Sequence, residues 1–177
     1  MTRHILTSAI ACAVGWTALA VTSALAQTPQ SAGSTSPHEA HVQMNTRGNQ
    51  GMGFDQAATT HHFYLREDGG VIEVTVKDPK DKTNLTGIRA HLPDVMKLFA
   101  AGNFSTPDFV HDESVPGTEE MKRLRDRIAY AYQDVPNGGR INIKTRHARA
   151  LSAVHEFLRY QITEHHTGDP MQVTRIR

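Results

Sequence analysis

The chain has 177 residues, with 19 lysines and arginines against 18 aspartates and glutamates, and it contains 11 histidines. This balance and the absence of a basic patch argue against nucleic-acid binding. The only cysteine is Cys12.

The first 26 residues have the pattern of a signal peptide. A short basic start at Arg3 and His4 precedes an apolar run over residues 5–21, and Ala24-Leu25-Ala26 gives an A-x-A cleavage site. The run is too short and too interrupted for a membrane anchor, and no second apolar run follows. We therefore expect a periplasmic or secreted protein without stable membrane insertion.

Removal of residues 1–26 also removes Cys12, which lies too early in the chain to be an acylated lipoprotein cysteine. The mature chain then has no thiol, so any metal would be bound through nitrogen, oxygen or thioether. Residues 27–53 are poor in large apolar side chains and rich in Ser, Thr, Pro, Gly and Gln, which predicts a disordered leader. A single domain is expected over residues 54–177.

The domain begins with a predicted hairpin and helix. Residues 61–67 and 71–77 alternate apolar and polar side chains around Asp68-Gly69-Gly70, which is typical of two strands joined by a turn. An apolar stripe of helical period follows over residues 85–101. Pro93 interrupts this stripe, so we expect either a kink or a helix that starts later.

The second half begins with a connector over residues 103–117, which has no strong period, and a short predicted helix over residues 119–125. Alternation at residues 128–132 and 141–143 around a Gly-Gly turn at residues 136–139 predicts another hairpin. Leu151 to Asp169 then follow as the strongest amphipathic helix of the chain.

The two halves match in sequence pattern, as repeat units of about residues 61–102 and 128–168. Aligning the two Gly-Gly pairs superimposes the apolar positions of both hairpins and both helices, and it places Gly102 on Gly168. This predicts an α+β fold made of duplicated ββα units, with a four-stranded antiparallel sheet and two main helices on one face. The opposite face would carry Tyr64, Glu73, Thr75, Asn142 and Lys144.

Five histidines have positions that favour burial. His61 points inward at the start of the first strand, and His155 and His165 flank the stripe of the last helix. His91 lies at the margin of the first helix's stripe, and His111 lies in the connector, which could fold over the end of the core. Neither H-x-x-x-H nor H-E-x-x-H occurs, so only the fold can bring them together.

Converging neutral imidazoles would suit a transition metal, and we expect copper or zinc. Met96 or Met121 nearby would favour copper, while Glu156 and Asp112 are available as carboxylate partners of histidine. Such a protein would buffer, deliver or use a metal. The expected ligands are His61, His111 and His155 first, with His91 and His165 next.

Other interpretations of these histidines remain open. Each inward histidine could instead hydrogen-bond to backbone carbonyls or carboxylates. The protein could then be a metal-free module that binds a protein partner or small ligand, and it could form a homo-oligomer. A third alternative is a small enzyme in which His155 works with Glu156 or Asp112 as an acid/base pair. A hydrolase is less favoured because neither G-x-S-x-G nor S-x-x-K is present.

Several segments together resemble a family of small exported bacterial proteins without an established function. The resemblance rests on residues 52–74 (MGFDQAATTHHFYLREDGGVIEV), 88–92 (IRAHL), 110–112 (VHD), 136–143 (PNGGRINI) and 153–170 (AVHEFLRYQITEHHTGDP). Members are sometimes labelled aspartate carbamoyltransferase. We do not expect that activity, because the chain has no S-T-R-T-R motif for carbamoyl phosphate and is about half as long as the catalytic chain. The resemblance implies only that the histidines named above, with His62, lie in the family's most recognisable segments.

Overall fold

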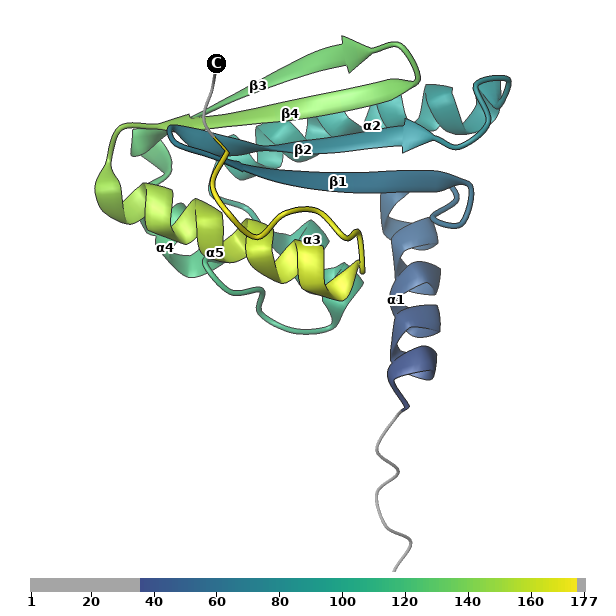
Figure 1. The fold of residues 1–177 in the computed structure, drawn as a ribbon, viewed down its shortest axis with the longest axis horizontal. Helices are drawn as coiled ribbons and strands as arrows, with labels where there is room; N and C mark the ends of the chain where they lie inside the picture. The colour runs from purple at the N-terminus through teal and green to yellow at the C-terminus, as the bar shows by residue number, and fades with distance from the viewer. Residues whose placement is uncertain (1–35, 175–177) are drawn as a thin grey trace, which may run out of the picture. The chain divides into compact units, whose positions relative to one another are not determined.

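The computed structural model describes residues 36–174, which form one four-stranded antiparallel sheet with α-helices. The predicted signal peptide and the first part of the predicted leader lie outside these residues. The strands are β1 (Thr59–Arg66), β2 (Gly69–Val76), β3 (Ile128–Val135) and β4 (Gly138–Thr145), in the order β1-β2-β4-β3. The predicted α+β class is confirmed, and Figure 1 shows both hairpins in this sheet.

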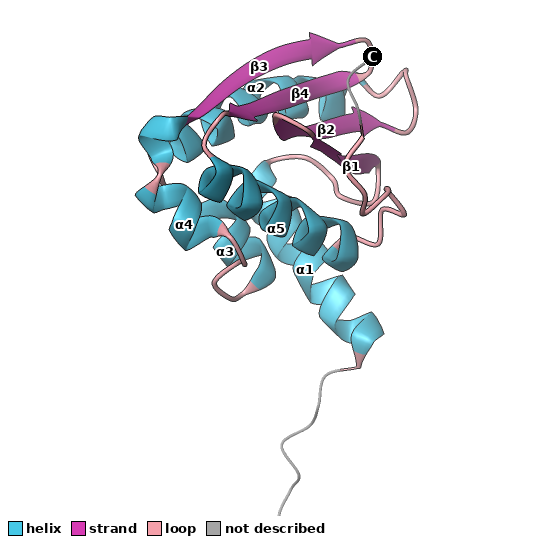
Figure 2. Ribbon diagram, turned by 60° about the vertical axis from the view of Figure 1, so that its left-hand side comes forward, coloured by secondary structure: helices cyan, strands magenta, loops and turns pink. Residues whose placement is uncertain are grey.

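Two long helices pack against the same face of the sheet. They are α2 (Lys82–Ala100) and α5 (Ala148–Glu164), and their apolar stripes share one core with the inward residues of the strands. Figure 2 shows the strands as one layer with the helices gathered on one side. Pro93 lies inside α2, which starts at Lys82, so the alternative of a later helix start is wrong.

The long helix of each ββα half packs mainly on the strands of the other half. Helix α2 contacts β3 and β4 of the second half, and α5 contacts β1 and β2 of the first. At the junction of the hairpins, Ile72 pairs with Ile141, its counterpart in the sequence alignment, so a local two-fold axis passes between them. Counterparts therefore occupy equivalent environments, which makes the two halves directly comparable.

The paired glycines have a role other than the predicted one. They begin strands β2 and β4 instead of forming the turns, which are at residues 67–68 and 136–137. A Cβ on Gly70 would lie 2.2 Å from Cδ1 of Leu158, and a Cβ on Gly139 would lie 3.0 Å from Cδ1 of Leu92. The glycines thus let each helix approach the hairpin of the other half.

The predicted leader is wrong over most of its described length, because Pro37–Met52 form helix α1. Ser36 and Glu39 make a reciprocal capping box, with Pro37 in the first turn, so the helix has a specific start. Met44 is buried, and the Arg47 side chain donates through Nε to the Val110 carbonyl at 2.8 Å. The folded domain therefore begins well before the predicted boundary.

The predicted connector also contains a helix. Helix α3 (Ser105–His111) packs against α1 and ends with Asp112 in the left-handed region, at φ 60°. His111 is thus the last residue of a helix instead of a loop residue. The predicted short helix is present as α4 (Thr118–Arg123), followed by one 3₁₀ turn over Arg125–Arg127.

The segment after α5 runs back along the edge strand β1. One oxygen of Asp169 accepts from the Phe63 backbone N–H at 2.9 Å, and the other lies 2.9 Å from Nδ1 of His62. Thr174 N–H donates to the Leu65 carbonyl at 2.9 Å. These bonds satisfy part of an otherwise open sheet edge. In residues 36–174, none of the helices combines the length and apolar character needed to cross a membrane.

Candidate functional site

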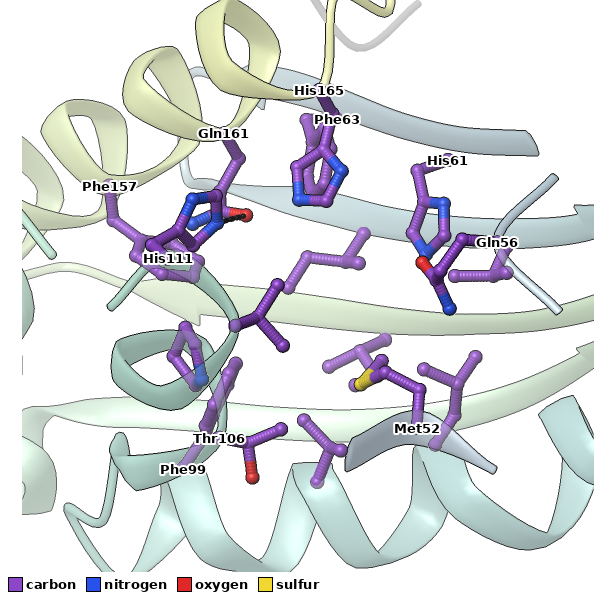
Figure 3. Close-up of a pocket in the computed structure, with 17 residues that line it drawn as sticks. Met52, Gln56, His61, Phe63, Phe99, Thr106, His111, Phe157, Gln161 and His165 are labelled. Carbon is purple, nitrogen blue, oxygen red and sulfur yellow. Dashed lines mark hydrogen bonds between the residues drawn. The ribbon is translucent and has the colours of Figure 1, made fainter. Parts of the chain in front are cut away.

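A cavity of about 60 Å³ lies between the sheet, α2, α3 and α5 (Figure 3). Its floor consists of fully buried aliphatic and aromatic side chains from the sheet and both long helices: Ile72, Val74, Leu92, Val95, Phe99, Ile141 and Phe157. Its rim consists of polar or more accessible side chains: Met52, Gln56, His61, Thr106, His111, Gln161 and His165. Most of the polar groups that line the cavity, the three imidazoles and Gln161, therefore lie on one side of it, and Thr106 lies on the other (Figure 3).

Three imidazoles form a row along this rim. The ring centroids of His61 and His165 are 5.2 Å apart, and those of His165 and His111 are also 5.2 Å apart. Figure 3 shows His165 between the other two. The row joins strand β1, the residue that caps the C-terminus of α5, and the end of α3. We call these three side chains the imidazole corner.

Local structure explains how each side chain reaches this corner. Alternation along β1 turns His61 inward with Phe63, while His62 turns to the opposite face. Helix α5 ends one residue before His165, and His166 adopts the left-handed conformation at φ 50°. The Thr167 N–H bonds to the Ile162 carbonyl, which closes a Schellman-type turn and fixes the exit from the helix.

Burial keeps the three imidazoles neutral. Desolvation lowers the pKa of His61 to about 4, with repulsion from His62 as the smaller cause. Desolvation also lowers the pKa of His165 well below its usual value, and the neighbouring histidines lower it further. The pKa of His111 is lowered by burial, against an opposing hydrogen bond to Gln161. At neutral pH each ring thus keeps one nitrogen lone pair.

The bond between His111 and Gln161 orients one of these rings. Nε2 of His111 lies 3.2 Å from Oε1 of Gln161, and because the amide oxygen only accepts, the imidazole donates through Nε2–H. The lone pair of His111 then resides on Nδ1. Nε2 of Gln161 is buried and has no hydrogen-bond partner in the described part of the chain, so this amide is only half satisfied.

The imidazole corner is not arranged around a single point. The planes of His61 and His165 make an angle of 20°, and the lone pairs of two nearly parallel, stacked rings cannot meet at a nearby ion. Within residues 36–174, no group of three or more His, Cys, Asp or Glu side chains is disposed to hold a metal ion. Ligation by these rings requires at least one of them to rotate.

His155, a first choice as ligand from the sequence, lies apart from this row. Its inward position is as predicted, but its Nε2–H donates to the backbone carbonyls of Arg66 at 2.9 Å and Gly69 at 3.0 Å. A nitrogen that donates to two carbonyls has no lone pair to offer a metal. His155 therefore joins α5 to the β1–β2 turn, and it does not line the cavity.

His91 is also separate from the imidazole corner. Its ring contacts the edge of Phe54 at a centroid distance of 6.3 Å, and Phe54 in turn stacks on His61 at 6.1 Å. Burial lowers the pKa of His91, whose Nε2 has no hydrogen-bond partner among the described residues. An aromatic ring thus stands between His91 and the row.

The carboxylates and thioethers expected near the site lie elsewhere. Glu156 and Asp112 are exposed, and Asp112 is 3.9 Å from the guanidinium of Arg47. Nε2 of His155 bonds to the backbone carbonyls of Arg66 and Gly69 and not to either carboxylate. Neither Met96 nor Met121 lines the cavity.

Sequence reasoning missed Met52 and Gln161 as rim residues. Met52 was assigned to the end of the leader, and only recognition of the S-x-x-E capping box would have placed it in a helix. Gln161 had a visible signal. It occupies the position in α5 that Val95 occupies in α2, and an amide on an apolar stripe indicates a special environment.

The corner that the local two-fold axis relates to the pair His61 and His165 is aromatic. The counterparts of His165 and His61 are Phe99 and Tyr130, which meet edge to face at a centroid distance of 6.2 Å. Phe99 also contacts Phe104 and Phe157, at 4.8 and 5.9 Å. We call Phe99 and Tyr130 the aromatic corner. The same fold position thus accepts ordinary core side chains.

Comparison with known proteins gives no match for the chain among protein-family models, curated proteins or solved structures. The functional argument therefore rests on the geometry of the site.

Proposed function

We propose that this protein binds a transition-metal ion, copper in its Cu(I) state, through His61, His165 and His111. The observation that carries the proposal is the row of three neutral imidazoles with ring centroids 5.2 Å apart. Two imidazoles bound to one ion at about 2.0–2.1 Å have their ring centres roughly 5 Å apart in tetrahedral geometry. The observed centroid distances match this spacing, and binding would require the rings to rotate until their lone pairs meet at one ion.

The charge of the surroundings favours Cu(I) over a divalent ion. All 17 residues around the cavity are uncharged side chains, and its floor is apolar. The cost of transferring an ion from water into such a site rises steeply with its charge, so a monovalent ion is held more easily than Zn²⁺. The Met52 thioether lines the same cavity and is a soft donor of the kind Cu(I) prefers.

The bond between Gln161 and His111 supports the same assignment. Ligating histidines generally donate their second ring N–H to a fixed acceptor, which orients the ring and sets the tautomer. Nε2–H of His111 already has such an acceptor in Oε1 of Gln161 at 3.2 Å. Together with the predicted export, this supports a role in binding or transferring copper outside the cytoplasm.

Competition titration with a chromophoric Cu(I) chelator under anaerobic conditions tests the proposal. We expect one equivalent of Cu(I) to bind, with affinity reduced in His61→Ala and in His165→Ala. His38→Ala is the matched control, because this histidine is exposed on α1. The competing hypothesis of a metal-free module predicts no stoichiometric uptake, or equal affinity in all four proteins. Parallel titration with Zn²⁺ separates the two metals.

A further inference from the structure

Beneath the imidazoles, the cavity has properties that a metal site does not require. The floor residues Val74, Leu92 and Ile141 are at most 1% exposed, and they come from three different elements. Protein interiors are packed closely enough that voids larger than one water are few. One water takes about 10–15 Å³ on this measure, so a cavity of about 60 Å³ has room for roughly four to six water-sized atoms.

The chemistry of the cavity floor disfavours charged ligands and water. None of the 17 lining residues is Asp, Glu, Lys or Arg. A buried water needs two to four polar partners, and the floor offers only Val, Leu, Ile and Phe side chains. A charged molecule would lose its hydration without gaining a counter-charge. An uncharged, mainly apolar molecule needs neither hydrogen-bond partners nor a counter-charge, so this floor can accommodate it.

Access is from the rim. The floor residues are buried, whereas the rim residues His61, His111, His165, Met52, Gln56 and Thr106 keep part of their surface exposed. Nε2 of Gln161 is the buried rim donor without a partner among the described residues, and it can accept one hydrogen-bonding atom of a ligand. The cavity is thus lined by apolar floor residues and by neutral polar side chains, with the imidazoles and Gln161 on one side and Thr106 on the other (Figure 3).

We propose that the cavity floor, beneath the imidazole corner, is a binding site for a small, uncharged, mainly apolar molecule of a few non-hydrogen atoms. The proposal goes beyond the metal site and does not depend on it, because the lining residues that carry it are the apolar ones. A dry apolar cavity of about 150 Å³ accommodates benzene or xenon. This cavity is less than half as large, so the fitting probe is xenon.

The test uses metal-free protein under xenon pressure, followed through methyl chemical shifts in carbon–proton NMR spectra. We expect saturable shifts of the lining methyls of Val74, Val95 and Ile141, and none for buried methyls outside the cavity, such as Val115 and Val154. Val95→Phe should fill the cavity and reduce these shifts at least fivefold. Ile88→Val, a core change on the same helix away from the cavity, should leave them unchanged.

Absence of xenon shifts in the wild type, or equal shifts inside and outside the cavity, overturns the proposal. A Val95→Phe protein that folds and still responds like the wild type overturns it as well. If Val95→Phe does not fold, the comparison of lining and remote methyls in the wild type decides alone. Since no metal is present, a negative result here leaves the copper proposal standing, and a failed copper titration leaves this one standing.

Discussion

The imidazole corner and the aromatic corner occupy places that the local two-fold axis relates, and each joins a helix of one half to a strand of the other. In one, the end of α5 meets β1 through His165 and His61, and in the other, α2 meets β3 through Phe99 and Tyr130. Buried imidazoles stabilise a core less than phenyl rings do, because their polar atoms need partners. The fold position itself therefore does not require histidine, which supports the proposal that the imidazoles bind a ligand.

The second difference between the corners is the cavity. Phe99 packs against Phe104, Phe157 and Tyr130, and it borders the cavity only as part of the apolar floor. On the other side, Gln161 stands where α2 has Val95, and open space remains below the imidazoles. The two corners thus border the cavity with different chemistry, through the apolar ring of Phe99 in one and through imidazoles in the other.

The largest expected effect comes from making the aromatic corner resemble the imidazole corner. Phe99→His with Tyr130→His should lower the free energy of unfolding by about 4 kcal/mol, since large apolar volume is lost and polar atoms are buried. Urea denaturation measures this loss. Phe109→His is the control, because Phe109 is 48% exposed and should change stability little. A loss below about 1 kcal/mol would show that the two corners are interchangeable.

The reverse exchange tests the function of the imidazole corner. His61→Tyr with His165→Phe should weaken Cu(I) binding at least about 100-fold, because two of the three proposed ligands are removed. Stability should stay equal or rise, since neutral aromatic rings replace desolvated imidazoles. Chelator competition and urea denaturation measure the two effects. Unchanged Cu(I) affinity would place the metal elsewhere.

His155 should behave as a structural residue. His155→Ala leaves the carbonyls of Arg66 and Gly69 without this donor, and it leaves a cavity between α5 and the β1–β2 turn. We therefore expect the free energy of unfolding to fall by about 2 kcal/mol. The Cu(I) affinity of the folded protein should be unchanged. Weaker Cu(I) binding at wild-type stability would return His155 to the ligand set.

Lowering the pH should destabilise the protein through the imidazole corner. The pKa of His61 is about 4 in the folded protein and about 6.5 when exposed, so the unfolded chain takes up the proton first. The contribution of neutral His61 to the free energy of unfolding is therefore fully present above pH 6.5, and it is lost as the pH falls towards 4. Between pH 7 and 5 this residue alone accounts for roughly 2 kcal/mol, and His165 adds to it in the same direction.

Urea denaturation at both pH values measures the change. The His61→Tyr, His165→Phe protein is the comparison, and it should lose clearly less stability between pH 7 and 5 than the wild type. Equal losses in the two proteins would mean that other groups cause the effect.

The smallest expected effect concerns Gln161. Gln161→Val copies the residue at the equivalent position of α2 and removes the acceptor that orients His111. We expect Cu(I) affinity to fall about 10-fold, as for other residues that orient metal ligands. Gln161→Glu, which keeps an acceptor oxygen, should bind more tightly than Gln161→Val. The opposite order would contradict the orienting role.

The strands and long helices could be predicted because their side chains follow regular periods. Phe63 and Val74 face the core as their alternation indicated, and the repeat located the counterparts in the second hairpin. The exchange of helices between the halves was not predictable, because it depends on close approach at Gly70 and Gly139.

Helices α1 and α3 escaped prediction for different physical reasons. Helix α1 is mostly polar and is stabilised by its capping box and by packing on α3, neither of which gives a periodic apolar signal. Helix α3 has only seven residues, too few to establish a period.

The site was predicted in part. His61, His111 and His165 were among the expected histidines, and the structure brings these three together. His155 was ranked with the first choices because its position on the stripe indicated burial, which is correct. Its partners are backbone carbonyls of a turn, and the position of such carbonyls cannot be derived from side-chain pattern.

X-ray absorption at the copper edge, on protein loaded with one equivalent of Cu(I), tests the central claim most directly. Three imidazoles, or two with the Met52 sulfur, should surround the ion, with nitrogen at about 2 Å. This spectrum should be retained in His155→Ala and lost in the His61→Tyr, His165→Phe protein. A wild-type spectrum without imidazole scattering, or one that survives in the double variant, would contradict binding at the imidazole corner.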